Sequence, residues 1–507
     1  MRIPEADARF WSWLLPFAGA SLALAFAPFG LWPLAILTLA LLFIAWHGAR
    51  PRRAAWFGFL FTAGTFLAGT YWLYHSIHVI GQAPLWLAMF LMLGLVAIMG
   101  AYTALLGYVT ARWRSRSRSL HWLVVLPAGW VLTEWLRGWF LSGFPWLALG
   151  YSQIDAPLAG FAPLAGVYGL SLLVALSAGA IAMAVVLSGT RRWLVAVAVL
   201  VPIYAVGALL VGREWTRPTG SPISVAIVQG AVPQELKWND AFRDSTLELY
   251  RSLTLPYLGR DLIVWPEAAL PALAHELNDY LAHLWSEAHA SGTDLVTGLL
   301  RYDFKTASYY NGLLALSDGM HWYYKRRLVP FGEFFPVPQF VRDWMKLMSL
   351  PYTDFVPGES GQPALPAGGV QLAATICYED AYGAEQLEVL ERATVLVNVT
   401  NDAWFGDSTA KYQHLEISRM RALEAGRPLL RAANDGISAI LGPAGQIEDR
   451  LVEARPGVIA GVVQPRVGLT PYARTGNLPV VLVCLVGFAA GFAPLGRSRI
   501  RSPSHWP

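Results

Sequence analysis

Long apolar stretches separated by short polar loops make up the first 212 residues, and one more apolar stretch lies near the C-terminus. A helix that crosses a bilayer needs about 20 mostly apolar residues. The pattern therefore predicts eight membrane-spanning helices, at about 10–28, 31–48, 55–75, 85–110, 120–138, 161–187, 193–212 and 477–496. The apolar segment 141–151 contains Gly143 and Pro145 and is too short to span, which indicates a loop or a re-entrant segment.

Between residues 213 and 470 the pattern changes to short β-branched runs and amphipathic stretches. The expected strands are 223–229, 261–265, 294–300, 311–316, 370–376, 394–399, 428–433 and 437–441. The expected helices are 240–256, 277–291, 383–392 and 409–425. Strands that alternate with helices are typical of an α/β domain with helix-covered sheets. We therefore expect a seven-helix membrane domain over 1–212, an α/β domain over 213–470, and an eighth helix with a tail over 471–507.

Composition agrees with a polytopic membrane protein. Hydrophobic residues make up 55% of the chain and charged residues only 14%, whereas a soluble domain has roughly 25% charged residues. These values exclude a fully soluble protein, a disordered chain and a nucleic-acid binder with a basic surface. Two cysteines in 507 residues exclude a disulfide scaffold and a cysteine-rich metal site.

Charge divides the chain in the same way and predicts its orientation. The 213–470 block has 22 basic and 30 acidic residues, a net charge of −8, while the remainder has 16 arginines and 4 acidic residues. Alternate loops and the two termini hold 14 arginines, and the loops between them hold neither lysine nor arginine. Since basic residues mark the cytoplasmic side, both termini are expected inside and the 213–470 block outside, in the periplasm of a bacterium.

Three motifs in the 213–470 block each place a reactive side chain directly after an apolar run. They are W-P-E ending at Glu267, Y-K-R-R-L-V-P-F-G-E with Lys325 and Glu333, and I-C-Y-E with Cys377. A cysteine between a strand and a helix suits a nucleophile, because a helix N-terminus favours the thiolate. Such a nucleophile needs a base and a group that holds oxyanion charge, and Glu267 and Lys325 are candidates because no histidine lies close in sequence. From the residues alone, a buried packing cysteine and ordinary ion-pair residues stay open as the alternative.

The order Glu, Lys, Cys in these motifs resembles the nitrilase, or carbon–nitrogen hydrolase, superfamily. With eight spans and the α/β block between spans seven and eight, the whole chain resembles the apolipoprotein N-acyltransferase family. Further matching pieces are V-Q-G at 228–230, P-Q at 233–234, K-W at 237–238, Y-N at 310–311 and N-D-A-W-F-G at 401–406. Arg327 departs from the family pattern at a position without a catalytic role. The resemblance implies an αββα four-layer sandwich inserted between transmembrane helices seven and eight.

The resemblance also implies residue roles. Cys377 is the nucleophile, Glu267 the general base and Lys325 the stabiliser of the tetrahedral intermediate. The supporting residues are Glu333, Tyr378 and Glu379. The substrate-binding residues are Trp238, Asn311, Trp404 and Phe405.

The implied enzyme is an acyltransferase that works in two halves. The thiolate attacks an ester of a phospholipid, typically phosphatidylethanolamine, and releases a lysophospholipid. The thioester then passes its acyl chain to the α-amine of the N-terminal S-diacylglyceryl-cysteine of an apolipoprotein. The resemblance implies no cofactor, metal or nucleic-acid partner, and we expect a monomer in the bacterial inner membrane.

Both implied substrates are anchored in lipid, so the site should face the bilayer and keep water away from the thioester. The stretch 344–350 is unusually apolar for the α/β block, which favours a mobile lid that gates lipid entry. Trp139, Phe144, Pro145 and Trp146 lie on the same outer face. Core packing or an interfacial aromatic belt stays open as the alternative for these side chains.

Two other functions share part of this pattern. A membrane-tethered amidase or nitrilase that acts on a small amide uses the same triad but does not need seven preceding spans. A transporter or channel with a periplasmic receptor domain needs intramembrane charge, for which the spans offer only Glu134 and Arg137. Phospholipid-dependent acylation, and its loss when Cys377 is replaced, separates these readings.

Overall fold

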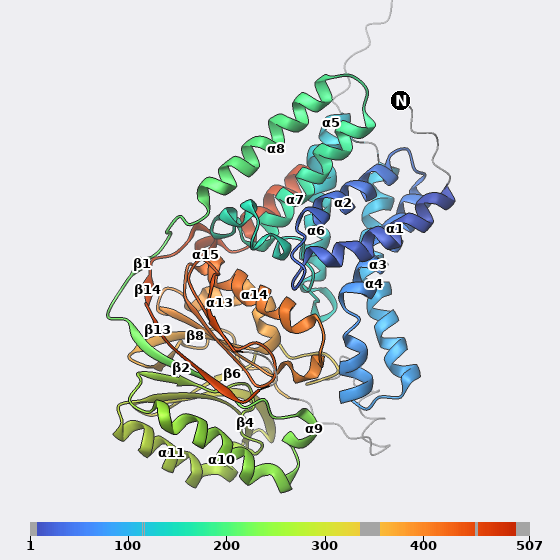
Figure 1. Ribbon diagram of the computed structural model, residues 1–507. Helices are drawn as coiled ribbons and strands as arrows, with labels where there is room; N and C mark the ends of the chain where they lie inside the picture. The colour runs from blue at the N-terminus through green and yellow to red at the C-terminus, as the bar shows by residue number, and fades with distance from the viewer. Residues whose placement is uncertain (1–7, 114, 116, 335–354, 452–454, 493–507) are drawn as a thin grey trace, which may run out of the picture.

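The computed structural model describes residues 8–113, 115, 117–334, 355–451 and 455–492. The stretch 344–350, which the sequence suggests as a lid, and the C-terminal tail lie outside these residues. Helices gather at one end of the molecule and two stacked sheets at the other (Figure 1). The linker that follows α8 (Arg191–Leu210) joins the two parts.

Each of the eight predicted apolar stretches contains helix. The helices are α1 (Ala8–Leu22), α2 (Pro33–Trp46), α3 (Pro51–Gly69), α4 (Leu85–Arg112), α5 (Arg118–Leu120) with its continuation α6 (Leu126–Arg137), α7 (Ala162–Val186), α8 and α16 (Leu478–Phe492). By length and composition, three described helices could cross a membrane: Leu85–Arg112, Pro157–Val186 and Arg191–Leu210. The helices α2 and α16 are apolar but shorter. This helical part is consistent with insertion in a membrane.

Two six-stranded sheets form the α/β part. One has the order β13-β2-β3-β4-β5-β6 and the other the order β12-β11-β10-β9-β8-β7. The first contains β2 (Ile223–Gln229), β3 (Leu262–Val264), β4 (Asp294–Asp303), β5 (Ser308–Leu316), β6 (Met320–Tyr324) and β13 (Gly457–Val463). The second contains β7 (Leu365–Ala367), β8 (Val370–Ile376), β9 (Val395–Thr400), β10 (Leu429–Ala433), β11 (Ala439–Leu441) and β12 (Ile447–Arg450). A short pair, β1 (Arg217–Pro218) with β14 (Arg466–Val467), lies beside them.

Side-chain alternation along the strands produces four layers. On β2, Val225 and Ile227 belong to the core between the two sheets, whereas Ala226 and Val228 pack toward α10 (Arg243–Thr254) and α11 (Asn278–Ala290). Successive side chains on a strand point to opposite faces, so an apolar run such as this is buried on both. The second sheet is covered by α14 (Ala410–Ala425) in the same way. The layers are therefore helix, sheet, sheet, helix, as predicted.

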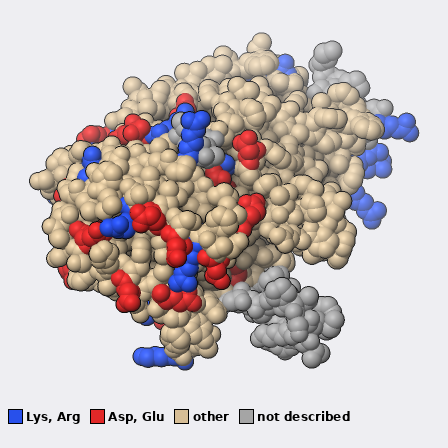
Figure 2. Space-filling view, turned by 60° about the horizontal axis from the view of Figure 1, so that its bottom comes forward, with Lys and Arg blue, Asp and Glu red and all other residues tan. Residues whose placement is uncertain are grey.

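Charge follows this division. Figure 2 shows acidic and basic side chains spread over the α/β part, while most of the helical part carries neither. Large apolar side chains are exposed there instead: Leu209 on α8 is 82% exposed and Trp86 on α4 is 70% exposed. Such an apolar surface is costly in water and suits a lipid environment.

Helix α14 joins the two parts. Its Gln413 accepts hydrogen bonds at Oε1 from the indole nitrogens of Trp146 (2.7 Å) and Trp72 (3.3 Å). Its Glu424 accepts one at Oε1 from the backbone N–H of Val167 (2.7 Å), inside α7. All five residues are buried. The helical part therefore contacts the α/β part through specific polar contacts and not through the linker alone.

Some elements differ from those expected. The stretch 383–392 forms the short helix α13 (Gly383–Gln386) and a separate 3-10 turn at Leu387–Val389, not one helix. The strands β6, β7, β12 and β13 were not expected. Segment 144–150 has neither helix nor strand, in agreement with a loop.

Candidate active site

Three strand ends bring the predicted triad together. Glu267 follows β3, Lys325 follows β6 and Cys377 follows β8. In each sheet the central strands run parallel, so their carboxyl ends meet at one edge. The Lys325 Nζ lies 3.4 Å from the Glu267 Oε1, and both charges act on the Cys377 thiol. Residues 58 and 52 positions apart thus form one cluster.

Lys325 lies between two carboxylates. Its Nζ is 2.9 Å from the Glu333 Oε1 and 3.4 Å from the Glu267 Oε1, and the side chain is 1% exposed. Burial by itself lowers the pKa of a lysine. Here the charges of Glu333 and Glu267 outweigh burial and raise the pKa of Lys325. The ammonium therefore keeps its proton and its charge.

Glu267 is held at both its carboxylate and its backbone. Its Oε1 accepts a hydrogen bond from the Asn311 amide (2.8 Å), and its Oε2 accepts one from the Asn401 N–H (3.0 Å). The Lys237 ammonium donates to its backbone carbonyl (3.2 Å). The next residue, Ala268, has a left-handed φ of +44°, a conformation that non-glycine residues rarely adopt. These contacts fix a strained turn.

Glu333 completes the cluster. Its Oε1 accepts hydrogen bonds from Lys325 and from the Asn311 Nδ2 (2.8 Å), and its Oε2 accepts one from the Val329 N–H (2.8 Å). Asn311 thus donates to both Glu267 and Glu333. The amide links the two carboxylates that share Lys325, and its predicted contact with the substrate stays a prediction.

Cys377, like Ala268, has a left-handed backbone conformation, with a φ of +51°. The cysteine is partly exposed. Burial, followed by the charge of Glu267, raises the pKa of its thiol. The Lys325 ammonium acts in the opposite direction. Because the pKa of the thiol is raised, the resting group is a thiol, and a base must take its proton before the sulfur can attack. Strained backbone of the kind seen at Cys377 is concentrated at functional positions.

Glu379 braces the nucleophile turn. Its Oε2 accepts a hydrogen bond from the Ile376 N–H (2.7 Å), and its Oε1 accepts one from the Arg326 N–H (2.6 Å). The Tyr323 hydroxyl donates to both oxygens. Burial raises the pKa of Glu379 to about 7 against these backbone hydrogen bonds. Glu379 therefore joins the turn of Cys377 to the segment that carries Lys325.

Tyr378 points toward the helical part. Its hydroxyl donates to the Gly143 carbonyl (3.1 Å), and its ring lies 6.5 Å from that of Phe144 and 6.4 Å from that of Trp146. Arg137 holds this loop by donating to the carbonyls of Phe144 (2.8 Å) and Trp146 (2.7 Å). A loop between α6 and α7 therefore packs beside the nucleophile.

The predicted substrate-binding aromatics differ in their surroundings. Trp238 is 48% exposed. Trp404 is 37% exposed, and its carbonyl accepts a hydrogen bond from the Ser76 hydroxyl of the helical part (2.7 Å). Phe405 packs against Trp72, with ring centres 4.7 Å apart. Trp404 and Phe405 therefore contact the helical part.

A buried polar network behind Cys377 was not predicted. The Asp402 Oδ1 lies 2.9 Å from the His414 Nδ1, and its Oδ2 accepts a hydrogen bond from Arg431 (2.8 Å). The His414 Nε2 is 3.3 Å from the Cys377 carbonyl oxygen. The motif N-D-A-W-F-G already contained Asp402, but nothing in the spacing pointed to His414 on α14.

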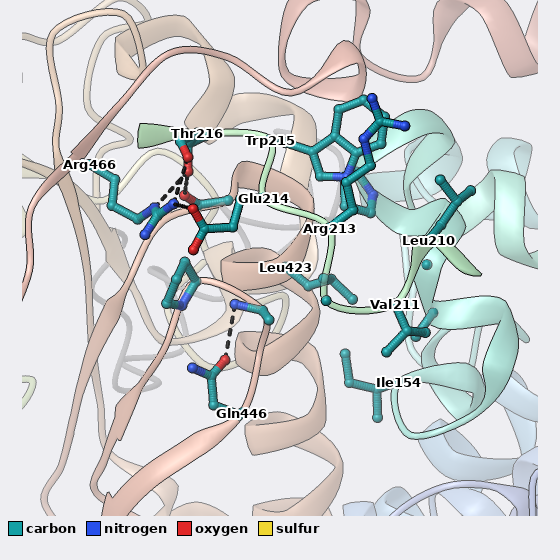
Figure 3. Close-up of a pocket in the computed structure, with 17 residues that line it drawn as sticks. Ile154, Leu210, Val211, Arg213, Glu214, Trp215, Thr216, Leu423, Gln446 and Arg466 are labelled. Atoms are coloured by element: carbon teal, nitrogen blue, oxygen red, sulfur yellow. Dashed lines mark hydrogen bonds and ion pairs between the residues drawn. The ribbon is translucent and has the colours of Figure 1, made fainter. Parts of the chain in front are cut away.

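A separate cavity of about 210 Å³ lies where α8 meets the α/β part (Figure 3). Leu210, Val211, Ile154 and Leu423 form apolar walls, and Glu214 pairs with Arg466 at 3.2 Å. The triad does not line it. Among the described residues, no three His, Cys, Asp or Glu side chains are placed to hold a metal ion.

Comparison with known proteins shows the family to which this chain belongs. The model of the apolipoprotein N-acyltransferase N-terminal domain matches residues 18–180, and the carbon–nitrogen hydrolase model matches residues 224–472. An apolipoprotein N-acyltransferase of Azotobacter vinelandii is 42% identical over 480 residues, 93% of each chain. One of Pseudomonas putida is 40% identical over 478 residues, 93% of this chain and 95% of the relative. A carbon–nitrogen hydrolase structure from Helicobacter pylori covers 48% of this chain and 89% of its own, with a TM-score of 0.37 and 15% identity.

The α/β part is therefore a nitrilase-like, carbon–nitrogen hydrolase domain, as the sequence predicted. Two relatives that are 40–42% identical over 93% of the chain then show which family the chain belongs to. The chain belongs to the apolipoprotein N-acyltransferase family and is an acyltransferase. Both sequence-based predictions, of the family and of the enzyme class, are confirmed.

Proposed function

We propose that this protein transfers an acyl chain from a phospholipid to the N-terminal amine of an S-diacylglyceryl-cysteine apolipoprotein, through a thioester on Cys377. The observation that carries the proposal is the single cluster formed by Glu267, Lys325 and Cys377 at one edge of the sheets. A covalent intermediate divides one difficult transfer into two easier steps.

In the first half, the Glu267 carboxylate takes the proton of the Cys377 thiol. The sulfur attacks the ester carbonyl carbon, and a C–S bond forms while the carbonyl oxygen becomes negative. The Lys325 ammonium, which the two neighbouring carboxylates keep protonated, donates a hydrogen bond to that oxygen. When the intermediate collapses, the ester C–O bond breaks and the leaving oxygen takes the proton from Glu267, so a lysophospholipid departs.

In the second half, the α-amine of the acceptor attacks the thioester carbonyl and Glu267 takes its proton. A C–N bond forms, the C–S bond breaks, and the Cys377 sulfur takes back a proton. Water has to be kept away, because hydrolysis of the thioester competes with transfer. The apolar contacts around Tyr378, Phe144 and Trp146 support this exclusion.

Four other residues support the reacting groups in this proposal. Asn311 and Glu333 form hydrogen bonds that hold Glu267 and Lys325 in place. Glu379 and Tyr378 fix the nucleophile turn from opposite sides. We keep Trp238, Trp404 and Phe405 as proposed contacts of the substrates, since Trp238 and Trp404 are partly exposed.

The proposed topology has eight spans, with the catalytic domain 213–470 in the periplasm between spans seven and eight. Its support is the distribution of arginines over alternate loops and the exposed apolar surface of α4 and α8. The proposed partners are a phospholipid donor, phosphatidylethanolamine by preference, and a diacylglyceryl-modified apolipoprotein acceptor. We propose that the protein is a monomer in the bacterial inner membrane.

Intact-mass analysis after incubation with phosphatidylethanolamine tests the first half-reaction. The parent protein should gain the mass of one acyl chain, and hydroxylamine should remove it because it cleaves thioesters. Cys377→Ala should gain nothing, while Cys484→Ala, which changes the cysteine in α16, should react like the parent. A folded parent protein that gains no mass would favour an amidase acting on a small amide.

A further inference from the structure

Two neighbouring strands end side by side at the nucleophile. β8 and β9 run parallel, and Ile376 is the register partner of Val399. The next residues along the two strands are Cys377 and Thr400. Thr400 is fully buried, with 0% exposure, so its hydroxyl needs partners inside the protein.

Those partners form a ring that starts and ends at the nucleophile. The Thr400 hydroxyl donates to the Asp402 Oδ1 (2.9 Å), and the same oxygen lies 2.9 Å from the His414 Nδ1. The His414 Nε2 is 3.3 Å from the backbone carbonyl oxygen of Cys377. The Thr400 hydroxyl also acts on the Cys377 thiol, whose pKa it lowers. The reaction described above uses neither Thr400 nor this ring.

We propose that Thr400 is a further catalytic residue, whose O–H turns from Asp402 to the Cys377 sulfur when the thiolate forms. The proposal rests on the proposed role of Cys377 as the nucleophile. In the resting state the Thr400 hydroxyl donates to Asp402. When Glu267 takes the thiol proton, the Thr400 hydroxyl keeps its own proton and rotates to donate it to the negative sulfur.

Asp402 can lose this hydrogen bond without being left unpaired. Arg431 still donates to its Oδ2 at 2.8 Å, and His414 still lies against its Oδ1. His414 and Arg431, together with the smaller effect of the Thr400 hydrogen bond, overcome the effect of burial and hold the pKa of Asp402 at about 2. The hydroxyl can therefore leave while the carboxylate stays ionised.

The negative charge of the Cys377 sulfur has few stabilising partners. Burial and the charges of Glu267 and Asp402 raise the pKa of the Cys377 thiol, and Lys325, followed by Thr400, lowers it. Lys325 also interacts with two carboxylates. A hydroxyl donor at the sulfur would therefore add to the stabilisation of the thiolate that Lys325 supplies.

The pH dependence of Cys377 alkylation by iodoacetamide tests the proposal, because the thiolate is the reactive form. A Cys484→Ala background leaves one thiol. A hydrogen bond to a charged group contributes about 1.5–3 kcal/mol, so Thr400→Val should move the alkylation midpoint up by about one to two pH units. Thr400→Ser keeps the hydroxyl and should leave the midpoint near that of the parent.

Thr293→Val is the matched control. Thr293 is also buried, and its hydroxyl accepts a hydrogen bond from the Gly259 N–H (2.8 Å) away from the triad. The Thr293→Val variant should lose a similar hydrogen bond, and its midpoint of Cys377 alkylation should stay at that of the parent. Thermal melting shows that the variants are folded, and Thr400→Ala is a second hydroxyl-free variant if the valine does not fold.

An unchanged midpoint in a folded, hydroxyl-free variant would overturn the proposal, as would an equal shift in Thr400→Ser. The assay contains neither phospholipid nor apolipoprotein. It can therefore support Thr400 even if acylation by phospholipid fails, so the two proposals are judged separately.

Discussion

Charge at the centre of the site is balanced by a small number of groups. Glu267 and Glu333 both contact Lys325, which alone cannot neutralise two carboxylates. The Asn311 amide adds one 2.8 Å contact to each carboxylate, beside the backbone N–H donors of Asn401 and Val329. Glu267 is thereby held in place next to a like charge.

Lys237 is a second buried ammonium near the base, and it should lower the stability of the fold at neutral pH. Burial lowers its pKa to about 8 from 10.5, although Glu267 acts to raise it. The folded protein thus binds this proton less tightly than the unfolded chain does. Stability should increase as the pH rises from about 8 to 10.5, and at pH 7 the buried charge costs up to about 3 kcal/mol.

Lys237→Met should therefore raise the melting temperature at pH 7. Loss of the hydrogen bond to the Glu267 carbonyl offsets about 1 kcal/mol of the gain. Melting curves of both proteins from pH 7 to 10.5 should show the advantage of the variant shrinking above pH 8. Lys305→Met, at an exposed lysine, is the control without such a trend. A variant that is less stable than the parent at pH 7 would contradict this account.

Residues at strand ends were predictable, and the family resemblance supplied the supporting Glu333, Tyr378 and Glu379, but the contacts that hold the site together were not predictable. The motifs around Glu267, Lys325 and Cys377 place reactive groups after apolar runs, and the structure brings these groups together. Asn311 contacts Glu267 across 44 positions, and His414 contacts Cys377 across 37. Such contacts depend on the pairing of strands and helices, which local periodicity does not report.

Secondary-structure elements show the same limit. Strands with long β-branched runs, such as β2, β8 and β9, were predicted almost to the residue. β7 contains a proline, β12 is largely exposed and charged, and β13 contains two glycines. These are edge or near-edge strands of the two sheets. Tertiary pairing, not local propensity, makes them strands.

Helix α14 should be the element that transmits changes in the helical part to the site. Gln413→Leu removes the acceptor of two buried indole N–H groups and the donor to the Gly69 carbonyl. Each buried group left without a partner costs about 1–3 kcal/mol. We expect a lower melting temperature and faster hydrogen exchange in the loop around Trp146.

Arg419→Ala is the matched variant on the same helix. Arg419, which is 17% exposed, pairs with Asp155, which is 70% exposed, and donates to the Gly445 carbonyl (2.8 Å). An ion pair with one exposed partner contributes about 0–1 kcal/mol. It should leave both the melting temperature and the exchange of the loop almost unchanged. If both variants change the melting temperature and the hydrogen exchange of the loop equally, the contacts of Gln413 do not have the role proposed for them between the helical part and the α/β part.

At the scale of the whole molecule, the two parts differ in the solvent that they suit. The α/β part carries most of the charge, and the helical part exposes apolar side chains (Figure 2). Both proposed substrates are anchored in lipid. Under the proposed function, we expect the joint through α14 and the loop near Tyr378 to keep the nucleophile close to the bilayer surface, which a freely tethered domain would not do.

The arginine distribution predicts the orientation of the molecule, which single cysteines in a chain without Cys377 and Cys484 can test. Phe304, in the turn between β4 and β5, is 70% exposed, and Arg52 is exposed at the start of α3. In spheroplasts of a bacterial host, a membrane-impermeant maleimide should label Phe304→Cys directly. It should label Arg52→Cys only after the membrane is permeabilised, because basic loops stay on the cytoplasmic side. Labelling of Arg52→Cys in intact spheroplasts would reverse the topology and remove the catalytic domain from the periplasm, where the proposed acceptor would have to meet it.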